Sequence, residues 1–251
     1  VTPHDGVNYT AEQVNTIIMQ SVQQAIQTRS AIRLPLNQNA KMTIAVTDVT
    51  GEVLGLFRMP DGTTFSLDVA VAKARNMRYY NDPTQLQAVD QVPGVAAGTA
   101  FTNRTIRYLA LPRFPEGIDN NPPGPFSQLN DGGTNPLTAQ NTGAPLPASA
   151  FQSVFGFSSF HPESNFRQQA DIPNQNGVIY FPGSSALYVG GQLIAGFGIS
   201  GDGVDQDDVV TFAGQAGFNA PDSLRADFAF YQGIRLPYQK FNRQPILPYG
   251  S

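Results

Sequence analysis

The first regular pattern of apolar and polar residues begins at Thr10 and has the spacing of an amphipathic helix. Gln13 follows Thr10 by three positions, which is the arrangement of a capping box at a helix N-terminus. Apolar residues then recur three and four positions apart and define one face, formed by Val14, Ile17, Ile18, Val22, Ala25 and Ile26. The pattern predicts a helix over about residues 11–30.

A second block, residues 42–80, has the pattern of a β-hairpin followed by a helix. Apolar side chains alternate over 42–48, a turn follows at Thr50–Gly51, and a second strand continues through 53–57. After a loop, Ser66 is in place to cap a helix that runs to about Tyr80. Three cations of this helix are expected to project outward or toward a ligand: Lys73, Arg75 and Arg78.

Residues 177–214 repeat the order of hairpin and helix. The pattern predicts short strands at 177–181, 186–189 and 192–200. Gly190–Gly191 fits the tight turn of this hairpin. The last strand carries small residues that permit close approach of another backbone, namely Ala195, Gly196 and Gly198. A short helix over 205–214 completes the block, so the two blocks predict the halves of one α/β core.

The residues between the blocks, 81–176, are rich in proline and weakly patterned apart from a possible helical turn at Thr102–Leu109. A structureless run of this length is uncommon in a compact domain. We therefore expect an ordered elaboration laid over the core, or an arm that contacts a partner. We expect one domain over 1–251, with its core at 10–80 and 177–217, the insertion at 81–176, and a proline-rich extended tail at 218–251.

Composition excludes several classes of function. The net charge is −4 without a long run of either sign, so the chain has no electrostatic footprint for nucleic acid. The absence of cysteine excludes disulfides, thiolate metal sites and covalent c-type haem attachment. No stretch approaches the ~20 apolar residues of a membrane span. Low charge and the lack of thiols are typical of an extracytoplasmic protein, either periplasmic or secreted.

The two blocks resemble the GlcG/HbpS-like haem-binding proteins. The residues that carry the resemblance are Ala45, Val46, Asp48, Gly51, Arg58, Ala70, Lys73, Ala74, Gly191, Gly196, Gly198, Ser200, Gly201 and Asp208. The resemblance implies a profilin-like α/β (α+β) unit, with an antiparallel sheet of about five strands flanked by helices. It also implies self-association into a homo-oligomer and binding of haem, with a role in iron management in some members. The long insertion is similar to that of secreted members, whereas the first helix lacks the histidine by which some relatives ligate haem.

Haem needs an axial donor, an apolar slot for the ring and cations for the propionates. His161 lies among aromatic residues in the insertion, and the alternative is a loop histidine that makes local hydrogen bonds. Met77, Tyr79 and Tyr80 at the end of the second helix are further candidate donors, unless they belong to the core. Arginines that could pair with propionates, or lie on solvated faces, are Arg75, Arg78, Arg104 and Arg107. The ring is expected between the second helix and the sheet, or under the insertion near His161.

The densest group of carboxylates lies at the start of the last helix, at Asp202, Asp205, Asp207 and Asp208. Oxygen ligands of this kind suit a hard cation. The alternative is helix capping with a favourable helix dipole, which by itself accounts for acidic residues at a helix N-terminus.

Two functions are therefore expected first. One is a non-catalytic, extracytoplasmic haem or tetrapyrrole carrier. The other is a structural or interaction module that assembles with itself or with an enzyme partner, through the insertion 81–176 and the C-terminal tail, without binding haem. An enzyme acting on a small organic acid is a third hypothesis. The sequence contains no nucleophile elbow and no phosphate loop.

Overall fold

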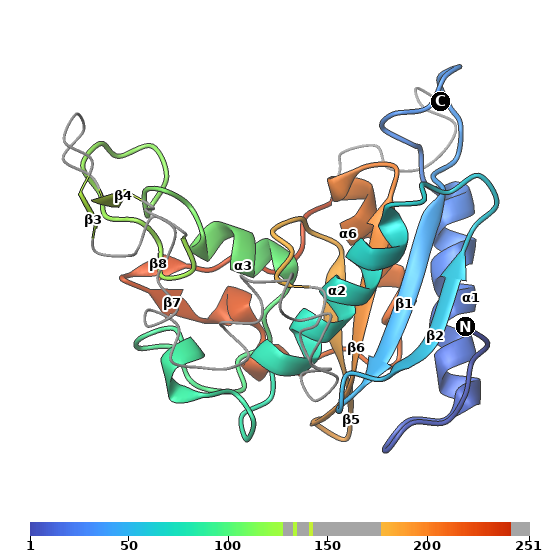
Figure 1. Ribbon diagram of the computed structural model, residues 1–251, viewed down its shortest axis with the longest axis horizontal. Helices are drawn as coiled ribbons and strands as arrows, with labels where there is room; N and C mark the ends of the chain where they lie inside the picture. Colours follow the sequence, from blue (N-terminus) through green and yellow to red (C-terminus); the bar gives the residue numbers. More distant parts are fainter. Residues whose placement is uncertain (128–132, 135–140, 143–176, 242–251) are drawn as a thin grey trace.

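Two β-hairpins join edge to edge to form the central sheet. The computed structural model describes residues 1–127, 133–134, 141–142 and 177–241. The first hairpin consists of β1 (Met42–Asp48) and β2 (Val53–Arg58), and the second of β5 (Ser184–Val189) and β6 (Gln192–Gly201). β1 pairs antiparallel with β6 along its whole length, which gives the strand order β2-β1-β6-β5 (Figure 1). The predicted α+β fold, an antiparallel sheet between helices, is confirmed.

The central sheet contains four strands, and the segment before the first helix adds hydrogen bonds along its β2 edge. Leu56 N–H donates to the carbonyl of Val1, and His4 N–H donates to the carbonyl of Leu54, each at 3.1 Å. The strand predicted at 177–181 is wrong. This segment is irregular because it bonds to a side chain: Asn76 Nδ2 donates to the Gly177 carbonyl (2.8 Å) and Asn76 Oδ1 accepts from Ile179 N–H (2.9 Å).

Helices α1 (Ala11–Gln27) and α6 (Val204–Gly214) cover one face of the sheet. The predicted capping box is present: Gln13 N–H donates to Thr10 Oγ1 (3.2 Å), and Thr10 N–H donates to Gln13 Oε1 (2.9 Å). The helix ends at Gln27, earlier than expected, and Ile26 is exposed rather than part of the apolar face. The core on this side is formed by side chains that include Val14, Ile17, Ile44, Val46, Phe197, Ile199 and Val210.

Helix α2 (Ser66–Tyr80) lies across the opposite face, as Figure 1 shows. The predicted close approach at β6 is confirmed, because a side chain at Gly196 or Gly198 would collide with the backbone carbonyl of Ala74 or Ala70. No flat ring fits into so close a contact, so the expected position between the second helix and the sheet is wrong. Ser66 is the first helical residue and not the cap; its hydroxyl accepts a hydrogen bond from Ser200 (3.1 Å).

A second layer of polypeptide packs beside β5 and the C-terminal half of α2. It contains α3 (Asn103–Leu109), the 3-10 helices η1 (Ala88–Asp90), η4 (Asp222–Leu224) and η5 (Ala226–Phe228), and the ribbon β7 (Phe230–Tyr231) with β8 (Ile234–Arg235). A second hydrophobic cluster, which includes Tyr80, Ile106, Phe114 and Leu236, holds this layer together. Another short ribbon pairs β3 (Gly133–Thr134) with β4 (Asn141–Thr142).

Residues 81–127 are thus an ordered elaboration of the core, and the helical turn predicted at 102–109 is α3, which begins with its own capping box at Thr102. The segment 218–241 was predicted to be extended but carries η4, η5 and the β7–β8 ribbon. The two segments are joined by a bridge between Ala100 and Arg225. Within the described ranges, no helix combines the length and the hydropathy needed to cross a bilayer.

Candidate functional site

Lys73 and Asp207 form a buried ion pair between α2 and α6. The Lys73 ammonium lies 2.9 Å from Asp207 Oδ2 and donates to the Ile199 carbonyl at 2.5 Å. Gly183, with φ +108°, leaves the space that this pair occupies, since a side chain there would meet both partners. Burial raises the pKa of Asp207 to about 6, and the ammonium opposes that rise. Lys73 therefore faces the interior and not a ligand, which corrects its expected outward position.

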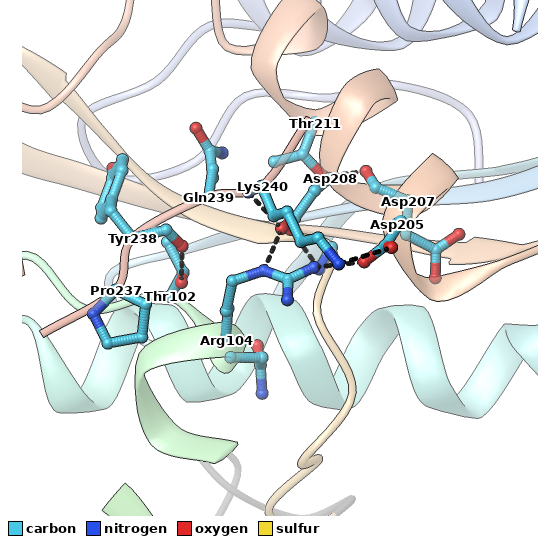
Figure 2. Close-up of polar contacts among 12 residues, drawn as sticks. Thr102, Arg104, Asp205, Asp207, Asp208, Thr211, Pro237, Tyr238, Gln239 and Lys240 are labelled. Atoms are coloured by element: carbon cyan, nitrogen blue, oxygen red, sulfur yellow. Dashed lines mark hydrogen bonds and ion pairs between the residues drawn. The ribbon is translucent and has the colours of Figure 1, made fainter. Parts of the chain in front are cut away.

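Asp208 and Asp205 bind a second set of cations, shown in Figure 2. Arg104 Nε donates to Asp208 Oδ2 (2.6 Å) and its Nη2 to Asp205 Oδ1 (2.7 Å). The Lys240 ammonium lies 3.2 Å from Asp205 Oδ2, and the Lys240 N–H donates to Asp208 Oδ2 at 2.9 Å. Burial raises the pKa of Asp208 against the effect of Arg104. Burial also acts on Asp205, but hydrogen bonds from Arg104 and Lys240 outweigh it and lower the pKa of that carboxyl.

This network fixes α3 and residues 236–240 against the start of α6. Two hydroxyl groups at the start of α3 complete the attachment. Thr105 Oγ1 donates to the Pro237 carbonyl (2.7 Å). Oγ1 of Thr102, the N-cap residue of α3, donates to the Tyr238 carbonyl, as Figure 2 shows. The core, the insertion and the C-terminal segment thus meet at one place.

The four aspartates are not assembled into a metal centre. Asp202 is bound by Arg33 and by the Lys41 N–H (2.9 Å), apart from the other three. In the part of the chain that the structure describes, no group of three or more His, Cys, Asp or Glu residues is arranged to hold a metal ion. The predicted cation site is therefore replaced by ion pairs, because each carboxylate has its own lysine or arginine partner.

A cleft of about 690 Å³ opens beside this network. We call it the α3 cleft; its walls are α3, the following loop, the start of α6 and residues 235–240. The lining combines apolar and aromatic side chains with cations: Leu111, Val204, Leu236, Pro237, Tyr108, Tyr238, Arg104, Arg107, Arg235 and Lys240. It also includes Glu116, Asp205, Asp227 and Gln239. A second cleft, of about 380 Å³, shares Arg107 and Leu111 with it and continues toward Phe126 and Tyr180.

The charged groups of the α3 cleft differ in whether they form ion pairs with other described residues. Arg104 and Lys240 are used by the aspartates of α6, and Asp227 is bound by Arg225 (2.6 Å). Within the described ranges, by contrast, the exposed Arg107 and Arg235 form no ion pair. Two guanidinium groups are thus available to an anionic ligand in a partly apolar cleft.

The other predicted haem-binding residues on α2 are buried away from this cleft. Met77, Tyr79 and Tyr80 belong to the second hydrophobic cluster. The Tyr79 hydroxyl donates to Asp90, and the Tyr80 ring packs against Phe126 with centroids 5.5 Å apart. They are core residues because α2 is covered by the insertion on this side.

Arg75 and Arg78 hold the loop that follows β1. Arg75 Nε donates to the Gly51 carbonyl (2.9 Å), and Arg78 donates to Val49 and to Gln85. Burial lowers the pKa of both guanidinium groups. They are therefore structural, in contrast to the exposed or ligand-facing position expected from the sequence. His161, the remaining predicted donor, lies outside the described residues.

Sequence reasoning identified Arg104 and Arg107 as possible propionate partners but missed Tyr108, Arg235 and Lys240. The last two lie in the segment for which the sequence predicts an extended tail. The close spacing of Arg235, Tyr238 and Lys240 was the available signal, but it gives no indication that α3 lies opposite.

No family model and no curated protein matches the chain. Among solved structures, similarity is found to protein ORFY of Klebsiella pneumoniae, of the DUF336 family, at 15% identity over 81% of this chain and 86% of that one, with a TM-score of 0.42. A PduOC–haem complex matches at 20% identity over 84% and 94%, with a TM-score of 0.38. A double mutant of HbpS from Streptomyces reticuli matches at 15% identity over 85% and 88%, with a TM-score of 0.40.

These neighbours are GlcG/HbpS-like proteins, in agreement with the resemblance found in the sequence. With TM-scores below 0.5, the ligand named for PduOC is a property of that protein. A function for this chain therefore has to be argued from its own residues.

Proposed function

We propose that this protein is a non-catalytic, extracytoplasmic binder of haem or a related tetrapyrrole, and that the ring occupies the α3 cleft. One observation carries the proposal: a cleft of about 690 Å³ combines partly apolar walls with two guanidinium groups, Arg107 and Arg235, that have no ion-pair partner in the described part of the chain. A tetrapyrrole has the matching chemistry, a flat apolar body with carboxylates on one edge.

The α3 cleft meets three requirements of such a ligand. Its volume lies within the range of about 300–1,000 Å³ that is usual for small-molecule sites. Leu111, Val204 and Pro237, which are partly exposed, supply apolar surface, and Tyr108 supplies aromatic surface. The phenol of Tyr108 lies at the wall and provides an oxygen donor of a type that haem iron accepts.

A bound haem supplies an iron centre and two carboxylates, and the protein's part is to hold both. In this arrangement Arg104 and Lys240 do not bind the ligand directly. They hold α3 and residues 236–240 in place through Asp205 and Asp208, so the cleft keeps its shape before the ligand arrives. His161 stays a predicted axial donor from the sequence, next to the donors of the cleft itself.

A second function, an interaction module, is favoured by a different observation. Phe212 and Phe241 are each about half exposed, and their rings pack edge to face with centroids 4.9 Å apart. Phe228 and Phe230 are also exposed, at 61% and 57%. Exposed aromatic side chains of this kind suit contact with another protein. In this alternative the chain is a single domain over 1–251 whose insertion and tail bind a second copy or an enzyme.

Visible spectroscopy tests the first function. The haem-free protein is titrated with haemin, and the haem-free variant His161→Ala is titrated in parallel. We expect a saturable, shifted Soret band with one site per chain. A band lost in His161→Ala assigns the axial donor to His161, and a band that survives assigns it to another residue. A titration without saturation overturns haem binding and favours the interaction module.

Light scattering tests self-association. We expect a homo-oligomer at tens of micromolar, since the proposed family relationship implies assembly of like units. A mass that corresponds to the monomer at this concentration contradicts the expectation.

A further inference from the structure

We propose that Tyr108 is the axial oxygen donor of the α3 cleft and that Arg107 and Arg235 bind the two ligand carboxylates. The inference rests on the proposed function, which it makes specific. The candidate ligand residues on α2 are buried. The proposal assigns their roles instead to two residues of the insertion and one of the C-terminal segment, all of which line the α3 cleft.

The ring of Tyr108 is held at the cleft wall by aromatic packing. It packs edge to face on Phe114, with centroids 5.2 Å apart, and Phe114 packs in the same way on Tyr231 at 5.1 Å. Phe114 is only 2% exposed, so the base of this stack is fixed in the second hydrophobic cluster. A ring with its position set in this way presents its hydroxyl at a defined place, as a ligand donor requires.

The hydroxyl of Tyr108 differs from those of the neighbouring tyrosines. Tyr238 pairs with Ser185 Oγ at 3.3 Å, and Tyr180 donates to the Phe126 carbonyl at 3.3 Å. No residue in the described ranges hydrogen-bonds to the Tyr108 hydroxyl, which is therefore free for a ligand. Tyrosine is an established axial donor to haem iron.

The two arginines provide the charge that a dicarboxylate needs. Arg107 precedes Tyr108 on α3, and Arg235 lies on β8, so they reach the cleft from two elements. Glu116 is an acidic lining residue that also lacks an ion pair in the described part of the chain, which leaves an excess of one positive charge. A planar guanidinium forms paired hydrogen bonds with a carboxylate, which an ammonium cannot do.

The test separates iron ligation from carboxylate binding by the choice of probe. Haemin carries iron and carboxylates, protoporphyrin IX carries carboxylates without iron, and haemin dimethyl ester carries iron without free carboxylates. Each is titrated into the wild type, Tyr108→Phe and the double variant Arg107→Gln/Arg235→Gln, with Soret and charge-transfer absorption and electron paramagnetic resonance as readouts.

The matched controls are Tyr180→Phe and Arg113→Gln, which remove a phenol and a guanidinium outside the α3 cleft. Far-UV circular dichroism and thermal unfolding of each variant confirm the fold.

We expect wild-type haemin to give the spectrum of a ferric phenolate complex. Tyr108→Phe loses this spectrum but binds protoporphyrin IX as the wild type does. The double arginine variant keeps the phenolate spectrum but binds haemin and protoporphyrin IX about 10-fold or more weakly, the effect of losing charge-assisted hydrogen bonds. The double arginine variant and the wild type have the same weak affinity for haemin dimethyl ester.

Two other results overturn parts of the argument in distinguishable ways. If the wild type binds haemin but neither set of substitutions changes the spectrum or the affinity, the assignment of these residues is wrong and the proposed function stands. If no probe saturates with the folded wild type, the proposed function fails, and the assignment fails with it.

Discussion

Lys73 on α2 and Asp207 on α6 are joined across β6 by a buried ion pair of 2.9 Å. Both residues lie in the two sequence blocks that resemble the GlcG/HbpS-like proteins, Lys73 within the helix motif and Asp207 next to Asp208. Helices from opposite faces of the sheet are thereby linked by charge as well as by packing. The ion pair with Asp207 explains why a lysine lies at position 73 of α2, and no ligand is needed to explain it.

Removal of the lysine leaves a buried carboxylate without its cation. We expect Lys73→Met to lower the free energy of unfolding by about 3–5 kcal/mol, the usual effect of breaking one side of a buried pair. Urea denaturation followed by circular dichroism measures it, and Lys41→Met, which removes a lysine bound to Asn39, is the control. The double variant Lys73→Met/Asp207→Asn should recover part of the loss. Equal stabilities for Lys73→Met and Lys41→Met contradict a structural role for the pair.

The same pair gives the protein an unusual dependence on pH. The pKa of Asp207 is raised from 3.8 to about 6 in the folded chain, because the carboxyl is buried. Between these values the folded chain keeps a proton that the unfolded chain has lost. The contribution of Asp207 to the free energy of unfolding therefore decreases as pH rises from about 4 to about 6, by about 3 kcal/mol in total.

Comparison with Asp207→Asn isolates this contribution, because all other carboxyl groups titrate in both proteins. The free energy of unfolding of the wild type minus that of the variant should decrease by about 3 kcal/mol over this pH range. Urea denaturation at four or five pH values measures the difference. A difference that stays constant, or grows as pH rises, shows that the folded-state pKa of Asp207 is not raised.

The elements of the core could be predicted because their signals are local. The capping box at Thr10 and Gln13 marked the start of α1, and the glycines of β6 indicated a close backbone neighbour. The neighbour itself, α2, and the central pairing of β1 with β6 depend on contacts between distant segments. For the same reason the sequence pattern predicts a strand at 177–181, although Asn76 binds the backbone of this segment.

The candidate site could be predicted only in fragments. Arg104 and Arg107 were recognised as possible anion partners, but their different roles depend on where α6 and the C-terminal segment lie. Arg104 is used by Asp208, whereas Arg107 faces the α3 cleft. Thr105 and Pro237, which join the two sides of this cleft, are 132 positions apart in the chain. No spacing rule relates residues at such a separation, so the sequence does not indicate that Tyr108 and Arg235 line the same cleft.

The close contact between α2 and β6 predicts that a single methyl group added on β6 strongly lowers the stability of the fold. We expect Gly198→Ala to destabilise the fold by about 3 kcal/mol or more, because the added carbon meets the Ala70 carbonyl, which cannot move as a side chain can. Gly190→Ala is the comparison, since the turn there has open space and only its φ of +58° is unfavourable. That substitution should cost about 1–2 kcal/mol. Thermal unfolding measures both, and a smaller loss at Gly198 than at Gly190 contradicts the close contact.

Arg104 should control the mobility of the segment that forms one wall of the α3 cleft. In Arg104→Gln the buried Asp208 loses its cation. The hydrogen bond from the Lys240 N–H to Asp208 is then one of the few contacts that still join α6 to residues 236–240. Hydrogen exchange measured by mass spectrometry should then show faster exchange of the Lys240 amide, by about 10-fold or more, with little change in α1.

Arg113→Gln is the matched control, because its partner Asp119 is exposed and far from Asp208 in the chain. Unchanged exchange over 236–240 in Arg104→Gln would mean that the hydroxyl bonds from Thr102 and Thr105 hold this wall without help from the ion pairs. The cleft would then be a rigid part of the hydrophobic layer, and the aspartates of α6 would matter for the stability of the core alone.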